Sequence, residues 1–301
     1  MSYLAVIGVG RGGIHAVSKM NHKPIFKDEV SFLVCDTDDV ILIKSPVENK
    51  ILMNCKPEGK RFLTEETKKD FKCRLSGFSI VFFVAGMGGI TGRDLLPELI
   101  EYCRELKITV SCFVTSPFTF EGEVKSKIAM ESISNIRKHA DSVVVINNDI
   151  IQESDSDFEL ANAFNKSHLI LAENCEVFFN ILCKPQHVCL DLNDYYSFMR
   201  NSAVTIIASG YSTGEKRVLL SFEAAIQSPL FKPYKIGEMD KIICAYQCSS
   251  HHQIAINEVE YIHEIMRSKI KKGSDFCWLV DFNDELNEEV KVTLVASIKN
   301  D

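Results

Sequence analysis

Two glycine-rich loops near the start of the chain have a spacing that suits phosphate binding. The first, AVIGVGRGGIHAV (residues 5–17), places Gly8, Gly10 and Gly13 in the pattern G-x-G-x-x-G after an apolar run. The second, FFVAGMGGITGRDLLPELI (residues 82–100), also follows an apolar run and leads into an amphipathic stretch. Glycine lets the backbone approach a ligand closely, and free N–H groups at a helix start hold a phosphate. Two such loops can hold one polyphosphate from two sides.

The first loop alone also fits a nicotinamide dinucleotide. Asp36 ends the next apolar run, about where a ribose-binding acid belongs in a Rossmann fingerprint. An oxidoreductase would leave the second glycine loop without a role, so we favour it least. Two tight turns without any ligand are a further alternative.

The elements that must position these loops alternate between apolar runs and amphipathic stretches. This pattern predicts a parallel sheet with crossover helices. Turn residues follow each run, and open α/β sheets bind ligands at the carboxyl ends of their strands. The predicted strands are Leu4–Ile7, Ser31–Cys35, Ile80–Val84, Thr109–Val114 and Ser142–Ile146.

A long helix is predicted to follow this sheet. Apolar residues recur there at spacings of four and three, and Pro185 ends the pattern. The run EEVKVTLVASI near the end of the chain alternates as a strand does. We therefore predict a nucleotide-binding domain over residues 1–164, a central helix over 165–184 and a smaller α/β domain over 185–301. The helical stripe consists of Phe164, His168, Leu171, Cys175, Phe178 and Leu182.

Composition excludes several classes of protein. The net charge of −7 over 301 residues argues against a general nucleic-acid binder, which needs clustered Lys and Arg. No apolar run is long enough to insert into a bilayer, and the first residues lack the basic start of a signal peptide. The eleven cysteines are odd in number and scattered, which indicates reduced thiols and a cytoplasmic location.

One cysteine cluster has two interpretations. Cys244, Cys248, His251 and His252 are close enough in sequence to bind zinc. Zinc sites usually pair two short ligand clusters separated by a longer loop, and this segment has only one. We therefore prefer an alternating strand with both cysteines on one face, followed by a polar turn, and we predict no metal site.

Several motifs, in order along nearly the whole chain, resemble the tubulin/FtsZ family. AGMGGITG is similar to the family sequence GGGTGTG with its preceding Ala-Gly-Met, and VTSPFTFEG is similar to V-T-x-P-F-x-F-E-G. GYSTGEKR, AIQSPLF and DELNEEVKVTLVASI also match stretches of FtsZ. The resemblance implies a Rossmann-like nucleotide-binding domain, a long central helix and a smaller second α/β domain. That is the architecture predicted above from pattern.

The resemblance assigns both glycine loops to the nucleotide phosphates. Arg11, Ile14 and His15 depart from the two glycines and the asparagine of the family, and Arg11 brings a cation toward the phosphates. The second loop keeps Thr91 but has Ile90 in place of a glycine. The expected phosphate-contacting residues are Gly10, Arg11, Gly12, Gly13, Ile14, His15, Gly88, Gly89, Ile90, Thr91 and Gly92.

Five further residues match family positions around the nucleoside. Glu121 corresponds to the acid that accepts from the ribose hydroxyls, and Lys125 to an arginine near the nucleotide. Asn148 corresponds to the asparagine that contacts guanine, and Phe164 to the ring beside the base. His168 replaces an Asp or Asn, so we expect a weakened preference for guanine, because neutral His offers one acceptor.

In the family, a loop after the central helix completes hydrolysis on a neighbouring subunit. Here PQHVCLDLNDYY supplies Asp191 and Asp194 as the catalytic acids, with Cys189 in place of the family's asparagine. Without the resemblance, this segment would be interpreted as a solvated acidic loop. Residues 44–77 depart furthest, since NCKPEGKR holds only Gly59 where the family has a glycine-rich γ-phosphate sensor.

The resemblance implies a guanine-nucleotide-binding, FtsZ-like cytoskeletal protein that assembles head to tail and hydrolyses GTP slowly at the subunit contact. The expected ligands are GTP or GDP, with Mg²⁺ as a candidate companion ion. The chain ends after its last predicted strand, where FtsZ proteins continue to an adaptor-binding peptide, so we expect a divergent FtsZ paralogue that needs a protein partner or adaptor. The alternative is a degenerate paralogue that holds nucleotide structurally and acts as an interaction module.

Overall fold

The computed structural model describes residues 3–23, 26, 30–55, 63–150, 159–183, 192–199 and 202–299. The chain divides into two compact units, Met1–Glu176 and Val177–Asp301, and the division falls within one long helix. Within the described residues, no helix is long and apolar enough to cross a membrane.

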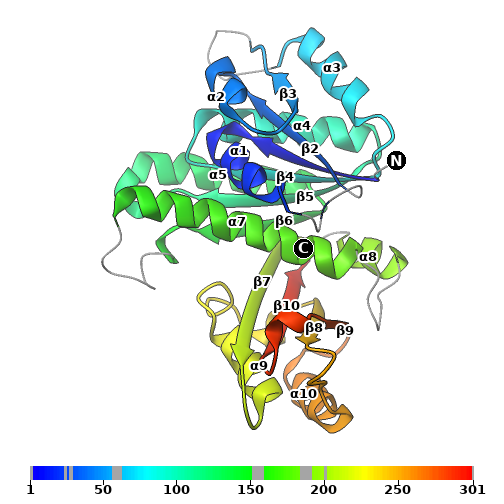
Figure 1. Cartoon of the computed structure of the whole chain (residues 1–301). Helices are drawn as coiled ribbons and strands as arrows, with labels where there is room; N and C mark the ends of the chain where they lie inside the picture. The colour runs from blue at the N-terminus through cyan, green and yellow to red at the C-terminus, as the bar shows by residue number, and fades with distance from the viewer. Residues whose placement is uncertain are drawn as a thin grey trace. The chain divides into compact units, whose positions relative to one another are not determined.

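The first unit contains a six-stranded parallel sheet in the order β3-β2-β1-β4-β5-β6 (Figure 1). Every strand predicted from the sequence is present, so the prediction of a parallel α/β sheet is confirmed. Its strands are β1 (Leu4–Val9), β2 (Val30–Asp36), β3 (Asn49–Leu52), β4 (Ile80–Gly86), β5 (Thr109–Ser116) and β6 (Ser142–Asn147).

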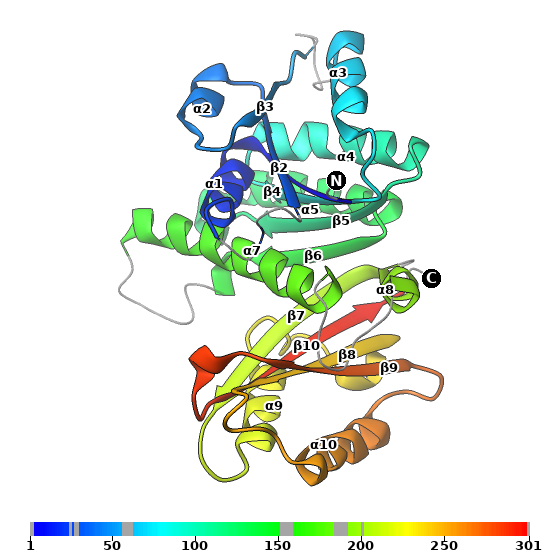
Figure 2. The same ribbon diagram turned by 45° about the vertical axis from the view of Figure 1, so that its right-hand side comes forward.

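Helices cover both faces of this sheet. α1 (Gly10–Met20) packs on β1, β2 and β4, and lies on the same face as α7 (Leu160–Cys183) (Figure 2). The opposite face carries α3 (Glu65–Leu75), α4 (Ile90–Glu105) and α5 (Glu123–His139), whose apolar residues form one core with the sheet. α2 (Asp39–Lys44) follows β2, and η2 (Thr119–Glu121) precedes α5.

The central strands are apolar on both faces because helices cover both. β1 and β4 pair in register from Leu4 with Ile80 to Val9 with Ala85, and nearly every residue of both strands is buried. Burial on both faces is typical of parallel sheets and explains their continuous apolar runs. It places both glycine loops at the same edge of the sheet, because β1 and β4 are neighbours and run in the same direction.

The second unit contains a mixed sheet in the order β7-β10-β8-β9, with only β8 and β9 parallel. α9 and α10 pack their apolar residues against this sheet. The elements are α8 (Leu192–Met199), β7 (Ser202–Ser212), α9 (Arg217–Gln227), η3 (Ile236–Glu238), β8 (Lys241–Cys248), α10 (Ile256–Lys269), β9 (Asp275–Phe282), η4 (Asp284–Leu286) and β10 (Val290–Ile298).

Cys244 and Cys248 lie on β8 and are fully buried in the core of the second unit. Burial raises the pKa of the Cys244 thiol to about 12, so this side chain packs as a small apolar group. The predicted strand is present, and both cysteines face the same core, but seven of its eight residues are buried, so it does not alternate between core and solvent. Among the described residues, no three His, Cys, Asp or Glu side chains are gathered as metal ligands would be.

Candidate nucleotide-binding site

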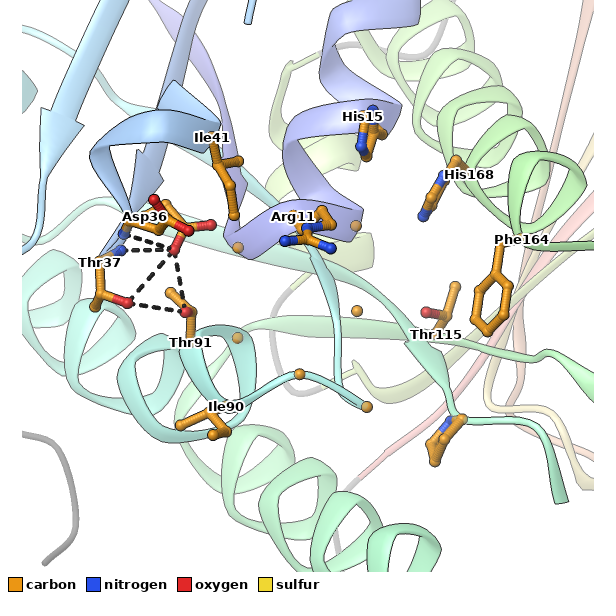
Figure 3. Close-up of a pocket in the computed structure, with 18 of the residues that line it drawn as sticks. Arg11, His15, Asp36, Thr37, Ile41, Ile90, Thr91, Thr115, Phe164 and His168 are labelled. Atoms are coloured by element: carbon orange, nitrogen blue, oxygen red, sulfur yellow. Dashed lines mark hydrogen bonds between the residues drawn. The ribbon is translucent and has the colours of Figure 1, made fainter. Parts of the chain in front are cut away.

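A cavity of about 1370 Å³ lies within the first unit. Residues of both glycine loops line it, together with residues that follow β2, β5 and β6 and residues of α7. Figure 3 shows Asp36, Thr37 and Thr91 grouped at one end of this cavity, and His15, His168 and Phe164 at the other. The cavity therefore lies at the carboxyl edge of the parallel sheet, where open α/β sheets bind ligands.

Close packing of α1 on β1 and β4 requires the glycines of the first loop. A Cβ on Gly13 would lie 2.0 Å from the carbonyl oxygen of Val84, and one on Gly8 would lie 2.8 Å from the carbonyl oxygen of Gly13. Gly10 begins α1 with a φ of +71°, a conformation that favours glycine. Gly13 and Ile14 are buried and do not line the cavity, so they support the loop from behind.

The second loop has the same construction. Gly89 is the N-cap of α4, and a Cβ on Gly92 would lie 2.7 Å from the carbonyl oxygen of Gly86. Among the described residues, no side chain caps the first N–H groups of α1 or α4, and neither helix has an acidic residue in its first turn. Free N–H groups and the positive end of the helix dipole favour an anion at both helix starts.

A hydrogen-bonded group joins the second loop to the segment after β2. The Asp36 carboxylate is 2% exposed and accepts from the Thr37 N–H at 2.6 Å and from the Thr91 hydroxyl at 3.2 Å. The Thr37 and Thr91 hydroxyl oxygens are 3.3 Å apart. Asp36 therefore holds the protein's own backbone and Thr91, rather than presenting a free acid to a ribose as the dinucleotide interpretation requires.

The lining of the cavity contains more carboxylates than cations. Among the described lining residues the cations are Arg11 and Lys125, and the carboxylates are Asp36, Asp38, Asp39 and Glu121. Lys125 forms an ion pair with Glu121, whose other oxygen accepts from the Phe118 N–H at 2.9 Å. Arg11 is exposed at the start of α1 and forms no ion pair with the described part of the chain. It is the cation that remains available to a phosphate.

Aromatic and amide groups form the other end of the cavity. The Phe164 ring packs edge-on against Phe118, with ring centroids 5.2 Å apart. Asn148 is 4% exposed and accepts at Oδ1 from the Ser167 hydroxyl at 2.6 Å. The rings of His15 and His168 are stacked, with centroids 5.3 Å apart and planes 21° from parallel.

Both imidazoles are held neutral at physiological pH. Burial, followed by the charge of His15, lowers the pKa of His168 to about 4 from its ordinary value of 6.5. Burial and then the nearby Arg11 and Lys19 lower the pKa of His15. This end of the cavity therefore presents neutral imidazole near the Asn148 amide.

The depressed pKa of His168 has a consequence for stability. Between pH 6.5 and 4 the unfolded chain binds a proton at this residue and the folded chain does not, so stability is lost as the pH falls through this window. The loss should be on the order of 3 kcal/mol if His168 acts alone. Denaturant unfolding at several pH values measures the free energy of unfolding, which should depend less on pH for His168→Phe than for the native chain. Equal slopes would contradict the shift.

Apart from Gly13 and Ile14, every predicted nucleotide-contacting residue lines this cavity. The predicted catalytic acids stand apart: Asp191 lies outside the described residues, and Asp194 belongs to α8 but its side chain is not described. Sequence reasoning did not include Thr37 or Ser167, which line the cavity too. The turn residues DTDD after β2 were a usable signal for Thr37, whereas a serine inside a helix gives no signal of its own.

The fold and the site define an α/β protein with two glycine loops at one cavity, an arrangement that suits a phosphate-bearing ligand. Residues 3–155 match the family model for the Tubulin/FtsZ family, GTPase domain, and the chain belongs to this family. It is 31% identical over 306 residues to the cell division protein FtsZ of Porphyromonas gingivalis, covering 98% of this chain and 66% of that protein. Cell division protein FtsZ 1 of Thermococcus kodakarensis is 27% identical over 302 residues, and the match covers 97% of this chain and 79% of that protein.

Solved structures share the fold. An empty FtsZ dimer from M. jannaschii has a TM-score of 0.85 at 23% identity and covers 99% of this chain and 88% of its own. The GTPγS-bound protofilament of CetZ2 from Haloferax volcanii has a TM-score of 0.80 at 14% identity, and the match covers 100% of this chain and 94% of that chain. The predicted fold class, a Rossmann-like domain, a long helix and a smaller α/β domain, is thus confirmed.

Proposed function

We propose that the cavity binds GTP or GDP and that the protein assembles head to tail as an FtsZ-like cytoskeletal GTPase. The observation that carries this proposal is the pair of uncapped helix starts, α1 and α4, at one cavity. Each supplies free N–H groups and a positive dipole end to one polyphosphate. Glu121 then binds the ribose, with Asn148 and Phe164 at the base.

Hydrolysis is proposed to need a second subunit. Asp191 and Asp194 of one subunit position the water that attacks the γ-phosphate bound by its neighbour. Two of the described carboxylates in the cavity, Asp36 and Glu121, are poor candidates for the base in that step, because they already hold groups of their own subunit. Membership of the GTPase-domain family and the protofilament of a structural relative support assembly.

A magnesium ion fits the charge of this site. Four carboxylates against two cations would repel a free triphosphate, whereas Mg²⁺ offsets the charge of the phosphates. Asp38 and Asp39 are exposed and line the cavity. Oxygen ligands of this type are those that Mg²⁺ prefers. When bound, the ion would neutralise charge that develops on the phosphates, while Arg11 does the same from α1.

Nucleotide binding tests the proposal directly. Nucleotide released from the denatured, purified protein should be GDP or GTP, and titration should show tighter binding of GDP than of NAD. Arg11→Ala should weaken GTP binding about tenfold or more, because a charge-assisted contact to phosphate is lost. Arg11→Lys is the matched control and should retain part of the affinity. Recovery of NAD(H), or tighter binding of NAD than GDP, contradicts the proposal.

A second candidate is an interaction module that holds nucleotide without turnover. The pairing of Lys125 with Glu121 favours it, because Arg11 is then the only free cation among the described lining residues. The lysine-containing segment at residues 56–61, which could supply more, lies outside the described residues. Bound GDP with no hydrolysis at any protein concentration would favour this candidate, which acts through a protein partner.

A further inference from the structure

The base end of the cavity offers hydrogen-bond donors rather than paired acceptors. Asn148 Oδ1 is occupied by the Ser167 hydroxyl, and both residues are buried, at 4% and 2% exposed. The Asn148 Nδ2 group makes no hydrogen bond within the described part of the structure, and Asn148 lines the cavity. The amide therefore faces a ligand with its N–H₂ side.

His168 presents one ring nitrogen to the cavity. Its Nδ1 is buried without a partner among the described residues, while Nε2 lies 3.6 Å from where a Cβ on the cavity residue Gly12 would be. Burying an unpaired N–H is rarer in proteins than burying an unpaired acceptor. The proton therefore belongs on Nε2, and the ring offers a donor to a ligand. Stacking on His15 holds the ring in this place (Figure 3).

These groups suit one edge of a purine and not the other. A 6-oxo group and N7 are both acceptors and match donors, whereas the N1–H and 2-amino group of guanine are donors that need an acceptor pair such as a carboxylate. The four described carboxylates of the lining do not supply that pair: Glu121 is paired with Lys125, Asp36 is bonded at the opposite end, and Asp38 and Asp39 follow Asp36 at the start of α2.

We propose that the site recognises 6-oxopurine nucleotides and does not read the 2-amino group, so that inosine nucleotides bind as well as guanine nucleotides. Ser167 is a positioning residue in this proposal, because it fixes which side of the Asn148 amide meets the base. His168 presents a donor to the base and therefore provides no acceptor for the 2-amino group. This inference rests on the proposed nucleotide-binding function.

The test compares GDP, IDP and ADP on the full chain by titration, because diphosphates avoid turnover. The native protein should bind GDP and IDP within about threefold of each other and ADP about tenfold more weakly or worse, because a 6-amino group meets a donor. Tighter binding of GDP than IDP by about tenfold would overturn the proposal. If none of the three binds, the proposed function fails instead.

Variants separate positioning from packing. Ser167→Ala should make the affinities for IDP and ADP similar, because the Asn148 amide can then turn either its oxygen or its N–H₂ group toward the base. The ratio of GDP affinity to IDP affinity should stay near one. Ser167→Thr keeps the hydroxyl and should restore discrimination against ADP. His168→Asp should raise GDP over IDP about tenfold, by supplying acceptors for the 2-amino edge. Each ratio comes from one preparation, so partial unfolding does not alter it, and an unchanged ratio in Ser167→Ala overturns the role of Ser167.

Discussion

Asp194→Ala should bind GTP with unchanged affinity and hydrolyse it about 100-fold more slowly or worse, the loss typical of removing a group that positions or activates the attacking water. Binding is spared because, in the proposed assembly, this acid acts on the neighbour's nucleotide and not on its own subunit's. Phosphate release at several protein concentrations, together with GTP titration, measures both quantities. Asn193→Ala changes the adjacent residue of the same segment, keeps both acids and should hydrolyse normally.

Mixtures distinguish catalysis in trans from catalysis within one subunit. Native activity per subunit should rise steeply with concentration, because the complete site exists only at a contact. Adding the Asp194→Ala variant should lower activity by more than dilution, since each variant subunit disables a neighbour's site. Normal hydrolysis by the variant, or activity per subunit that is independent of concentration, would refute the proposed mechanism.

Gly13→Ala should destabilise the first unit by about 3 kcal/mol or more and remove nucleotide binding with it. The added Cβ would lie 2.0 Å from the Val84 carbonyl oxygen, so α1 would have to separate from β4. Both elements carry glycine loops of the site. Thermal and urea unfolding, with GDP titration on whatever remains folded, measure the effect.

Gly12→Ala is the matched control for this substitution. Gly12 neighbours Gly13 in α1, but the nearest atoms to its added Cβ lie at 3.5 Å, which is ordinary contact. Alanine also favours helix over glycine, so the stability of this variant should be unchanged or higher. An equal loss in both variants would show that the loop tolerates no side chain at all, and not that Gly13 is the packing contact.

The parallel sheet was predictable because its signal is strong and local. Continuous apolar runs such as residues 80–84 are typical of parallel strands that helices cover on both faces, and glycines directly after them mark the ligand edge. Strand β1 runs to Val9, two residues beyond the predicted end at Ile7, and α1 begins at Gly10, so the glycine pattern located the strand-to-helix junction.

The contacts that set the chemistry of the site were not predictable in this way. The hydrogen bond between Ser167 and Asn148 joins residues nineteen positions apart on different elements. Neither the direction nor the burial of this bond follows from the spacing of residues in the sequence. The pairing of Lys125 with Glu121 likewise removes a cation that composition alone would assign to phosphate. Burial of Gly13 and Ile14 behind the loop follows from the path of α1 against β4, which only the assembled sheet defines.

The hydrogen bonds of Asp36 also limit which substitutions this part of the chain can tolerate during evolution. Thr37 and Thr91 come from different segments, yet one carboxylate serves both. Loss of the carboxylate would leave the Thr91 hydroxyl without this acceptor, and loss of Thr91 would remove a donor from an almost fully buried anion. The effects of substituting Asp36 and Thr91 on stability should therefore not be additive, and we expect these two positions to vary together. Relatives that exchange one of these side chains are expected to exchange the other as well.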